Sequence, residues 1–199
     1  MPTELVFDVA THTYRYNGNV VPGVTSVIES VGLSDFSMVP HDVLEQAKAF
    51  GAEVHKVTEK LDRGQQIQGD ISNATGLYLC HYIKFLHDLD VEIIEIEKRV
   101  FSEKYVYAGT LDRIAVLRKL SNQPVLFDIK TGVKSISHKV QTAAYEYAYK
   151  TDKRQKMDRY TLYLSNDGYK LSEAHTSRKD FDVFLAALSV HNFKKGGKP

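Results

Sequence analysis

The sequence predicts an α/β fold in which one central mixed β-sheet is flanked by helices. Two segments rich in β-branched and aliphatic residues, 107–117 and 125–130, are typical of strands. Apolar residues at helical spacing indicate helices over 40–63, 75–89 and 138–150. With 199 residues, of which 43% are hydrophobic and 26% charged, the chain is long enough to bury a core as one domain.

Composition limits the partners and the compartment. The net charge is +1, so affinity for nucleic acid would have to come from local basic patches and not from a global field. The single cysteine, Cys80, excludes an internal disulfide and fits a reducing cytoplasm; we expect it to be a buried structural thiol. The sequence has no apolar run long enough to span a membrane and no signal peptide, so we expect a cytoplasmic protein without a membrane partner.

The N-terminal part is predicted to form a small β-structure and a short helix. Leu5–Val9 and Thr13–Tyr16 are strand candidates, and Asn17-Gly18 is a tight-turn signal leading into Val20-Val21. A short helix over Val24–Val31 follows. We expect the hairpin to extend the central sheet and to cover its edge.

The helix over 40–63 carries two stripes. The apolar stripe consists of Val43, Ala47, Phe50, Val54, Val57 and Leu61. The second stripe consists of Gly51, His55 and Glu59, each four residues apart. A glycine inside a helix costs about 1 kcal/mol relative to alanine, which indicates that another group approaches the backbone there. His55 is either a site residue or a satisfied imidazole, and Glu59 either pairs with Lys56 or Arg63 or supports His55.

The elements that follow are predicted in less detail. The helix over 75–89 should turn Leu79, Tyr82, Ile83 and Leu86 inward. A long strand is expected over 91–101, in which Glu97 is either a solvated carboxylate or a site residue. After the central region, 159–165 and 169–174 should form a hairpin that extends the sheet, and a last helix should begin near Ser177. Polar loops at 32–38 and 64–73 and a basic tail at 194–199 complete the chain.

Three charged residues are expected to meet on two neighbouring strands. The polar turn 119–124 predicts that the strand containing Asp112 pairs with the strand containing Asp128 and Lys130. Side chains alternate along a strand, so Asp128 and Lys130 point to the same face. Such a cluster is costly in a core unless a cation and a negative substrate complete it. We expect these charges at the surface, where the fold does not depend on them.

The helix over 138–150 adds polar groups close to this cluster. Ser137 is a plausible N-cap. Gln141 and Tyr145 share one face of the helix, although an aromatic stripe is more often part of a core than of a ligand site. Lys134 and His138, in the basic connection before the helix, could contact phosphates.

Three sequence motifs, Gly109–Asp112, Asp128–Gly132 and Gln141–Tyr145, resemble those of the PD-(D/E)XK nucleases. Within them they resemble the RecB-like exonucleases, which include the RecB nuclease domain, the mitochondrial genome maintenance exonuclease and phage recombination exonucleases. The resemblance covers roughly residues 50–150. It implies a single nuclease domain over 1–199 with a restriction-endonuclease-like core: an N-terminal hairpin and short helix over 1–40, a catalytic core over 41–150, and a C-terminal hairpin and helix over 151–199.

The resemblance also implies roles for individual residues. Asp112 and Asp128, the main-chain carbonyl of Ile129 and the imidazole of His55 would bind Mg²⁺ or Mn²⁺. Asp112, Asp128 and Lys130 would be catalytic, with Lys130 positioning the attacking water.

Other residues are implied to hold the substrate or to support the site. Gln141 and Tyr145 match a motif that contacts the substrate strand beside the metal. Residues of secondary rank are Glu97, Glu59, Gly51, Thr131, Lys134 and His138.

The function implied is hydrolysis of DNA phosphodiester bonds from an end, in recombination, repair or phage DNA metabolism. The DNA would be single- or double-stranded, and a recombinase, a single-strand-binding protein or a second copy of the chain are expected partners. Three alternatives remain open: a catalytically silent DNA-binding or assembly protein, a structure-specific endonuclease, and an unrelated small-molecule metalloenzyme. A substrate pocket without basic walls would favour the last.

Overall fold

A computed structural model describes residues 4–34, 38–67 and 72–196. The predicted loops at 32–38 and 64–73 and the basic tail at 194–199 therefore fall partly outside the described residues. No helix among the described residues is long and apolar enough to cross a membrane.

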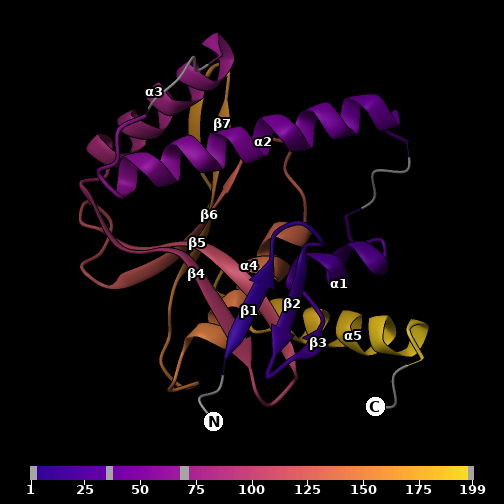
Figure 1. The fold of residues 1–199 in the computed structure, drawn as a ribbon. Coiled ribbons are helices and arrows are strands. Elements are labelled where there is room, and N and C mark those ends of the chain that lie inside the picture. The colour runs from indigo at the N-terminus through magenta and orange to yellow at the C-terminus, as the bar shows by residue number, and fades with distance from the viewer. Residues whose placement is uncertain (1–3, 35–37, 68–71, 197–199) are drawn as a thin grey trace.

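The central sheet has five strands and is mixed, which confirms the prediction of a mixed central sheet (Figure 1). Its strands follow one another in space in the order β4, β5, β6, β7 and β8. Their bounds are Val91–Ser102 (β4), Tyr107–Leu117 (β5), Pro124–Lys130 (β6), Arg159–Ser165 (β7) and Gly168–Leu171 (β8). Within this sheet β6 and β7 pair in parallel, because helix α4 (Ser137–Tyr149) forms the crossover between them, and the other described neighbours pair antiparallel.

The two predicted hairpins of the central sheet are present. Strands β5 and β6 are antiparallel neighbours, so the segments that carry Asp112 and Asp128 do pair directly. Strands β7 and β8 form the C-terminal hairpin at one edge, although β8 ends at Leu171 and not at Ala174. The last helix, α5 (Lys179–Lys194), begins two residues after Ser177.

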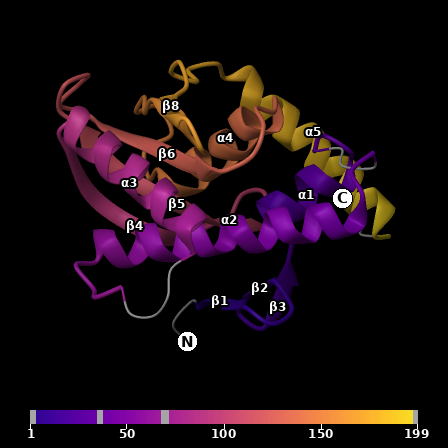
Figure 2. The same cartoon turned by 90° about the horizontal axis from the view of Figure 1, so that it is seen from above.

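The N-terminal strands do not extend the central sheet, so that expectation is wrong. β1 (Leu5–Asp8), β2 (Thr13–Tyr16) and β3 (Asn19–Val21) form a sheet of their own, which stands apart from the five-stranded sheet in Figure 2. The two sheets are joined where the Ala108 amide donates to the Pro22 carbonyl at 2.9 Å. Helix α1 (Val24–Ser30) follows directly.

Helices cover both faces of the central sheet and create two cores. On one face, α2 (His41–Asp62) and α3 (Asn73–Asp88) enclose a core that includes Val54, Phe85, Phe127 and Ile129. On the other face, α1, α4 and α5 enclose a core that includes Leu126. Alternating residues of β6 thus point to opposite cores, which makes the fold a three-layer α/β structure.

Several residues that were predicted to be buried are exposed. Apolar spacing shows which face of a helix is apolar, but not how much of that face the rest of the protein covers. Cys80 is exposed and is not a buried structural thiol. Ile83 of α3 is 44% exposed although it was expected to point inward. In α2 the apolar stripe is buried only towards its C-terminal half: Val43 is 49% exposed, whereas Val54 is fully buried. The N-terminal half of α2 runs beyond the sheet (Figure 1).

Candidate active site

The two aspartates of the central strands lie side by side below the surface. Asp112 on β5 and Asp128 on β6 are 6% and 1% exposed. Asp112 accepts a hydrogen bond from the Ile129 amide through Oδ2 at 2.7 Å, which ties the two strands together at this point. The expectation that these charges lie at the surface is wrong, because both side chains are buried and the Asp112 carboxylate binds a backbone amide of the neighbouring strand.

Asp128 is paired with Lys130 as the alternation along β6 predicts. The Lys130 Nζ lies 2.7 Å from Asp128 Oδ2. Burial raises the pKa of Asp128, and the neighbouring lysine only partly opposes that effect. Its Oδ1 atom is buried and has no hydrogen-bond partner among the described residues. An orphaned carboxylate oxygen of this kind is costly in a core, and a bound cation would relieve the cost.

His55, on α2, lies against the same pair of strands. Its Nε2 atom is 3.0 Å from the Ile129 carbonyl oxygen, and its Nδ1 atom is 3.6 Å from Asp112 Oδ2. When Nε2 carries the proton and donates to that carbonyl, Nδ1 keeps a lone pair directed at the carboxylate side. The Ile129 carbonyl, which the resemblance implies as a ligand, is thus in contact with His55 and holds its ring in place.

Among the residues that the structure describes, a group of side chains that could hold a metal ion consists of His55, Glu97 and Asp112. One ligand atom from each lies within 4.8 Å of the others. The set implied by the resemblance contains Asp128 in place of Glu97. Glu97, which the sequence leaves open between a solvated carboxylate and a site residue, thus lies beside Asp112.

The backbone and the charge of Glu97 are both unusual. It has a φ of 49° inside β4, in the left-handed region that residues with side chains rarely adopt. Burial, and then the charge of Asp112, raises the pKa of its carboxyl group to about 8. A strained residue with a perturbed carboxyl beside a second acid is typical of a functional site.

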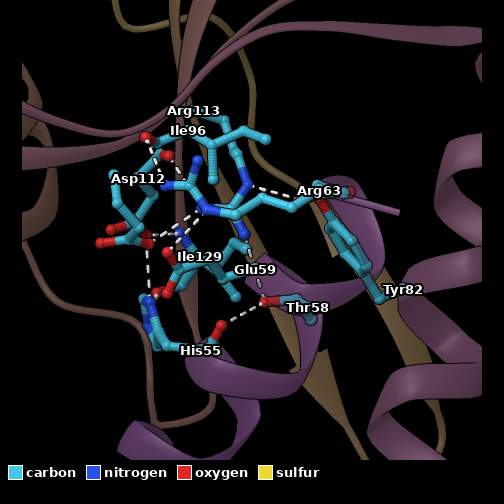
Figure 3. A network of polar contacts seen from close by, with 11 residues as sticks. His55, Thr58, Glu59, Arg63, Tyr82, Ile96, Asp112, Arg113 and Ile129 are labelled. Atoms are coloured by element: carbon cyan, nitrogen blue, oxygen red, sulfur yellow. Dashed lines mark hydrogen bonds and ion pairs between the residues drawn. The ribbon is translucent and has the colours of Figure 1, made fainter. Parts of the chain in front are cut away.

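Sequence analysis missed a buried arginine, Arg113, which lies beside Asp112 (Figure 3) and binds Glu97. Arg113 is fully buried and donates from Nη1 to Glu97 Oε1 at 2.9 Å and to the Asp112 carbonyl at 2.8 Å. Its Nε donates to Asp62 Oδ2 at 2.6 Å, and Asp62 also accepts from the hydroxyl of Tyr82 at 2.8 Å. The one available signal was a charged residue inside an otherwise apolar strand, directly after Asp112.

The structure explains two residues of the second stripe of α2, Gly51 and Glu59. A Cβ at Gly51 would lie 3.3 Å from the hydroxyl of Thr131, so the loop after β6 does approach the helix backbone as predicted. Glu59 pairs with Arg63, whose Nε donates to Glu59 Oε1 at 2.9 Å, and this is one of the alternatives left open. No bond joins Glu59 to His55 among the described contacts, so Arg63 is the partner that the structure records.

Helix α4 brings Gln141 and Tyr145 together over β5. The Gln141 amide nitrogen donates to the Tyr145 hydroxyl at 2.9 Å, and Tyr145 is only 4% exposed. A Cβ at Gly109 would come within 2.5 Å of the Tyr145 ring, so only glycine permits this packing. Ser137 does not cap α4: it is the first residue of the helix, and its amide bonds to the hydroxyl of Ser135 at 3.2 Å.

A cavity of about 330 Å³ opens next to Glu97, between the two sheets. It is lined by Phe7, Val9, Tyr14, Glu59, Glu97, Arg99 and Thr110. The guanidinium of Arg99 lies 6.0 Å from the centre of the Phe7 ring. The wall beside the carboxylates therefore contains a basic side chain, and the feature that would favour a small-molecule metalloenzyme is not met here.

Comparisons with known proteins find only distant structural similarity. No protein-family model and no curated protein matches the chain. Among solved structures, the chain is similar to SSO0001, with 15% identity and a TM-score of 0.43 over 89% of this chain and 76% of that one. It is also similar to an alkaline exonuclease, LHK-Exo from Laribacter hongkongensis, with 10% identity and a TM-score of 0.41 over 87% and 90%. Similarity at this level does not bear on the activity, which has to be argued from the site itself.

Proposed function

We propose that this protein is a metal-dependent DNA nuclease that hydrolyses phosphodiester bonds from DNA ends. The observation that carries the proposal is the grouping of His55, Glu97 and Asp112, whose ligand atoms lie within 4.8 Å of one another. The pair of buried Asp128 with the partly exposed Lys130 adjoins this group through the Asp112–Ile129 hydrogen bond. The resemblance of the sequence motifs to RecB-like exonucleases supports the same reading.

The donor set fits a divalent cation such as Mg²⁺ or Mn²⁺. Carboxylates are the ligands that Mg²⁺ prefers, and one imidazole shifts the preference towards Mn²⁺. Asp112 and Glu97 would bind it with His55, and the partnerless Oδ1 of Asp128 offers a further oxygen. When bound, such a cation supplies charge neutralisation at the scissile phosphate and a bound water of lowered pKa.

The chain's own residues would position the reactants. Lys130, whose side chain is 23% exposed, can donate to the attacking water or to a phosphate oxygen at the entrance of the site. Gln141 would hold the substrate strand, and buried Tyr145 would act by fixing the Gln141 amide. Thr131, next to Lys130, fixes the approach of the loop to α2 at Gly51.

The rival proposals differ in what they require of the site. A silent DNA-binding or assembly protein has no need for a buried carboxylate oxygen without a hydrogen-bond partner, such as Asp128 Oδ1. An endonuclease would share the chemistry but not the need for an end. A recombinase, a single-strand-binding protein or a second copy of the chain remains a proposed partner.

Hydrolysis of linear and closed circular DNA tests the proposal. We expect the wild-type protein to degrade linear single- or double-stranded DNA with Mg²⁺ or Mn²⁺ and to leave covalently closed circles intact. Addition of EDTA should stop the degradation. Product sizes on gels and acid-soluble nucleotide release measure both properties. Rapid linearisation of supercoiled plasmid would indicate an endonuclease, and no cleavage of any DNA in either metal would overturn the catalytic proposal.

Binding of Mn²⁺ by His55 gives a second test that does not depend on activity. We expect His55→Ala to weaken Mn²⁺ affinity by roughly 10- to 100-fold, the range for loss of a group that supports a metal site, or by more. Calorimetric titration with Mn²⁺ measures the affinity, and high Mn²⁺ should partly restore cleavage. His87→Ala, which replaces a histidine whose side chain is 89% exposed, is the matched control. An unchanged Mn²⁺ affinity with a lowered melting temperature would remove His55 from the metal site.

A further inference from the structure

A row of basic and aromatic side chains leads away from Lys130 across the sheet. In the strand register, Lys130 of β6 is the partner of Tyr163 of β7, and Tyr163 is the partner of Lys170 of β8. Register partners on neighbouring strands share a face of the sheet. The row therefore runs over two strand spacings, about 10 Å, from the candidate active site to the sheet edge.

Two residues of the connection into α4 complete this surface. The Lys134 Nζ lies 5.7 Å from the centre of the Tyr163 ring. His138 contacts the same tyrosine through Nδ1, 3.0 Å from its hydroxyl. We call the surface formed by Lys134, His138, Tyr163 and Lys170 the β7–β8 track; its lysines are exposed and its tyrosine is half-buried.

The charge of the track is not compensated. Neither Lys134 nor Lys170 forms an ion pair with a carboxylate among the residues that the structure describes, whereas Lys48, Lys84 and Lys98 each do. The charge of Lys170 lowers the pKa of Lys134, which shows that the two ammonium groups repel each other. Two like charges held near an aromatic ring without a counter-charge fit an anionic, planar-ringed ligand.

We propose that the β7–β8 track binds the phosphates of single-stranded DNA and leads the strand between Lys130 and the sheet edge. The inference rests on the proposed nuclease function and specifies where its substrate runs. In this arrangement Lys134 and Lys170 contact the phosphates as point charges, and the exposed part of the half-buried Tyr163 ring stacks against a base. His138 holds the tyrosine ring through its hydrogen bond.

Nucleic acid fits this surface better than an acidic peptide does. The track is continuous with Lys130, which points to the same face as Asp128, so a ligand on the track ends at the candidate active site. Single-stranded DNA carries one phosphate charge per nucleotide, which can bind the lysines, and bases that can stack on the tyrosine ring. Aspartate and glutamate side chains would match only the lysines.

The salt dependence of oligonucleotide binding tests the track. The full-length protein is titrated in EDTA, which prevents hydrolysis, against a fluorescent single-stranded oligonucleotide at several salt concentrations. We expect Lys134→Ala/Lys170→Ala to weaken binding and to reduce the slope of log K against log salt by about 1.4, at about 0.7 per lost phosphate contact. Lys119→Ala/Lys195→Ala removes two other exposed lysines that form no ion pair in the described part of the chain, and it should leave the slope unchanged.

The outcomes separate this inference from the proposed function. An unchanged slope in Lys134→Ala/Lys170→Ala, or an equal loss in the control, would overturn the track even if the wild-type protein cleaves DNA. Binding with the expected loss of slope, in a wild-type protein that cleaves no DNA, would support the track and overturn the nuclease proposal. Polyglutamate is titrated in the same way. If Lys134→Ala/Lys170→Ala weakens the binding of polyglutamate as much as that of the oligonucleotide, the surface binds acidic peptides in general, and the proposed DNA track would also be overturned.

Discussion

Replacing Lys130 with methionine is expected to reduce DNA hydrolysis by about 10²- to 10³-fold, the range for loss of one donor that stabilises a transition state. Methionine has a similar length but cannot donate a hydrogen bond. The Lys130 Nζ lies 2.7 Å from Oδ2 of the buried Asp128, and the Lys130 side chain is still 23% exposed. Lys130→Arg should not restore activity, because a planar guanidinium does not replace a compact ammonium. Single-turnover cleavage of linear DNA at saturating Mg²⁺ measures the effect.

The structure shows which control this experiment needs. Because Asp128 is 1% exposed, Lys130→Met leaves a buried carboxylate without its cation and can also lower stability. Asp128→Asn/Lys130→Met removes both charges and should melt closer to the wild type while remaining inactive. Lys119→Met, at an exposed turn, should keep full activity. Wild-type cleavage rates in folded Lys130→Met would contradict the catalytic role.

The sequence predicts the central sheet well because its signals are local. β-branched and aliphatic content marks β5 and β6, and the polar turn between them is short enough to leave an antiparallel pair as the direct solution. The position of β1–β3 depends on contacts distant in sequence, such as the hydrogen bond between the hydroxyls of Tyr14 and Thr110 at 2.8 Å. No local pattern distinguishes a hairpin that extends a sheet from one that forms its own.

The candidate site likewise has one part that follows from local sequence and another that only the tertiary fold brings together. Asp128 and Lys130 are two residues apart on one strand, so their proximity follows from the pleat alone. The grouping of His55, Glu97 and Asp112 combines α2, β4 and β5, and only the tertiary fold defines it. The resemblance of the motifs names His55 and Asp112 but implies Asp128 as the third side chain, whereas the packing of β4 against β5 brings in Glu97.

Arg113 explains why a second acid can be kept beside Asp112. Two carboxylates close together in a core repel each other, and each lowers the tendency of the other to ionise. The guanidinium of Arg113 bonds Glu97 and Asp62 from the other side and donates to the Asp112 carbonyl. The proposed metal site and the core of the fold therefore share one buried cation, Arg113.

Arg113→Met is accordingly expected to lower the free energy of unfolding by about 3–5 kcal/mol, the range for removing one partner of a buried ion pair. The change leaves Asp62, whose side chain is 1% exposed, facing the hydroxyl of Tyr82 alone, and it releases Glu97. Because burial already raises the pKa of Asp62, the loss of its cation should favour the protonated acid further. Urea denaturation at pH 7, followed by circular dichroism, measures the change.

Two further variants test whether the stability loss in Arg113→Met comes from the buried ion pair. Arg63→Met removes an arginine of the same helix-to-sheet region whose pair with Glu59 is 39% and 34% exposed, and it should cost no more than about 1 kcal/mol. Asp62→Asn/Arg113→Met neutralises both members of the buried pair and should recover part of the lost stability, because no isolated charge at Asp62 then remains in the core. A loss in Arg113→Met as small as that in Arg63→Met would show that the buried network does not hold the site together.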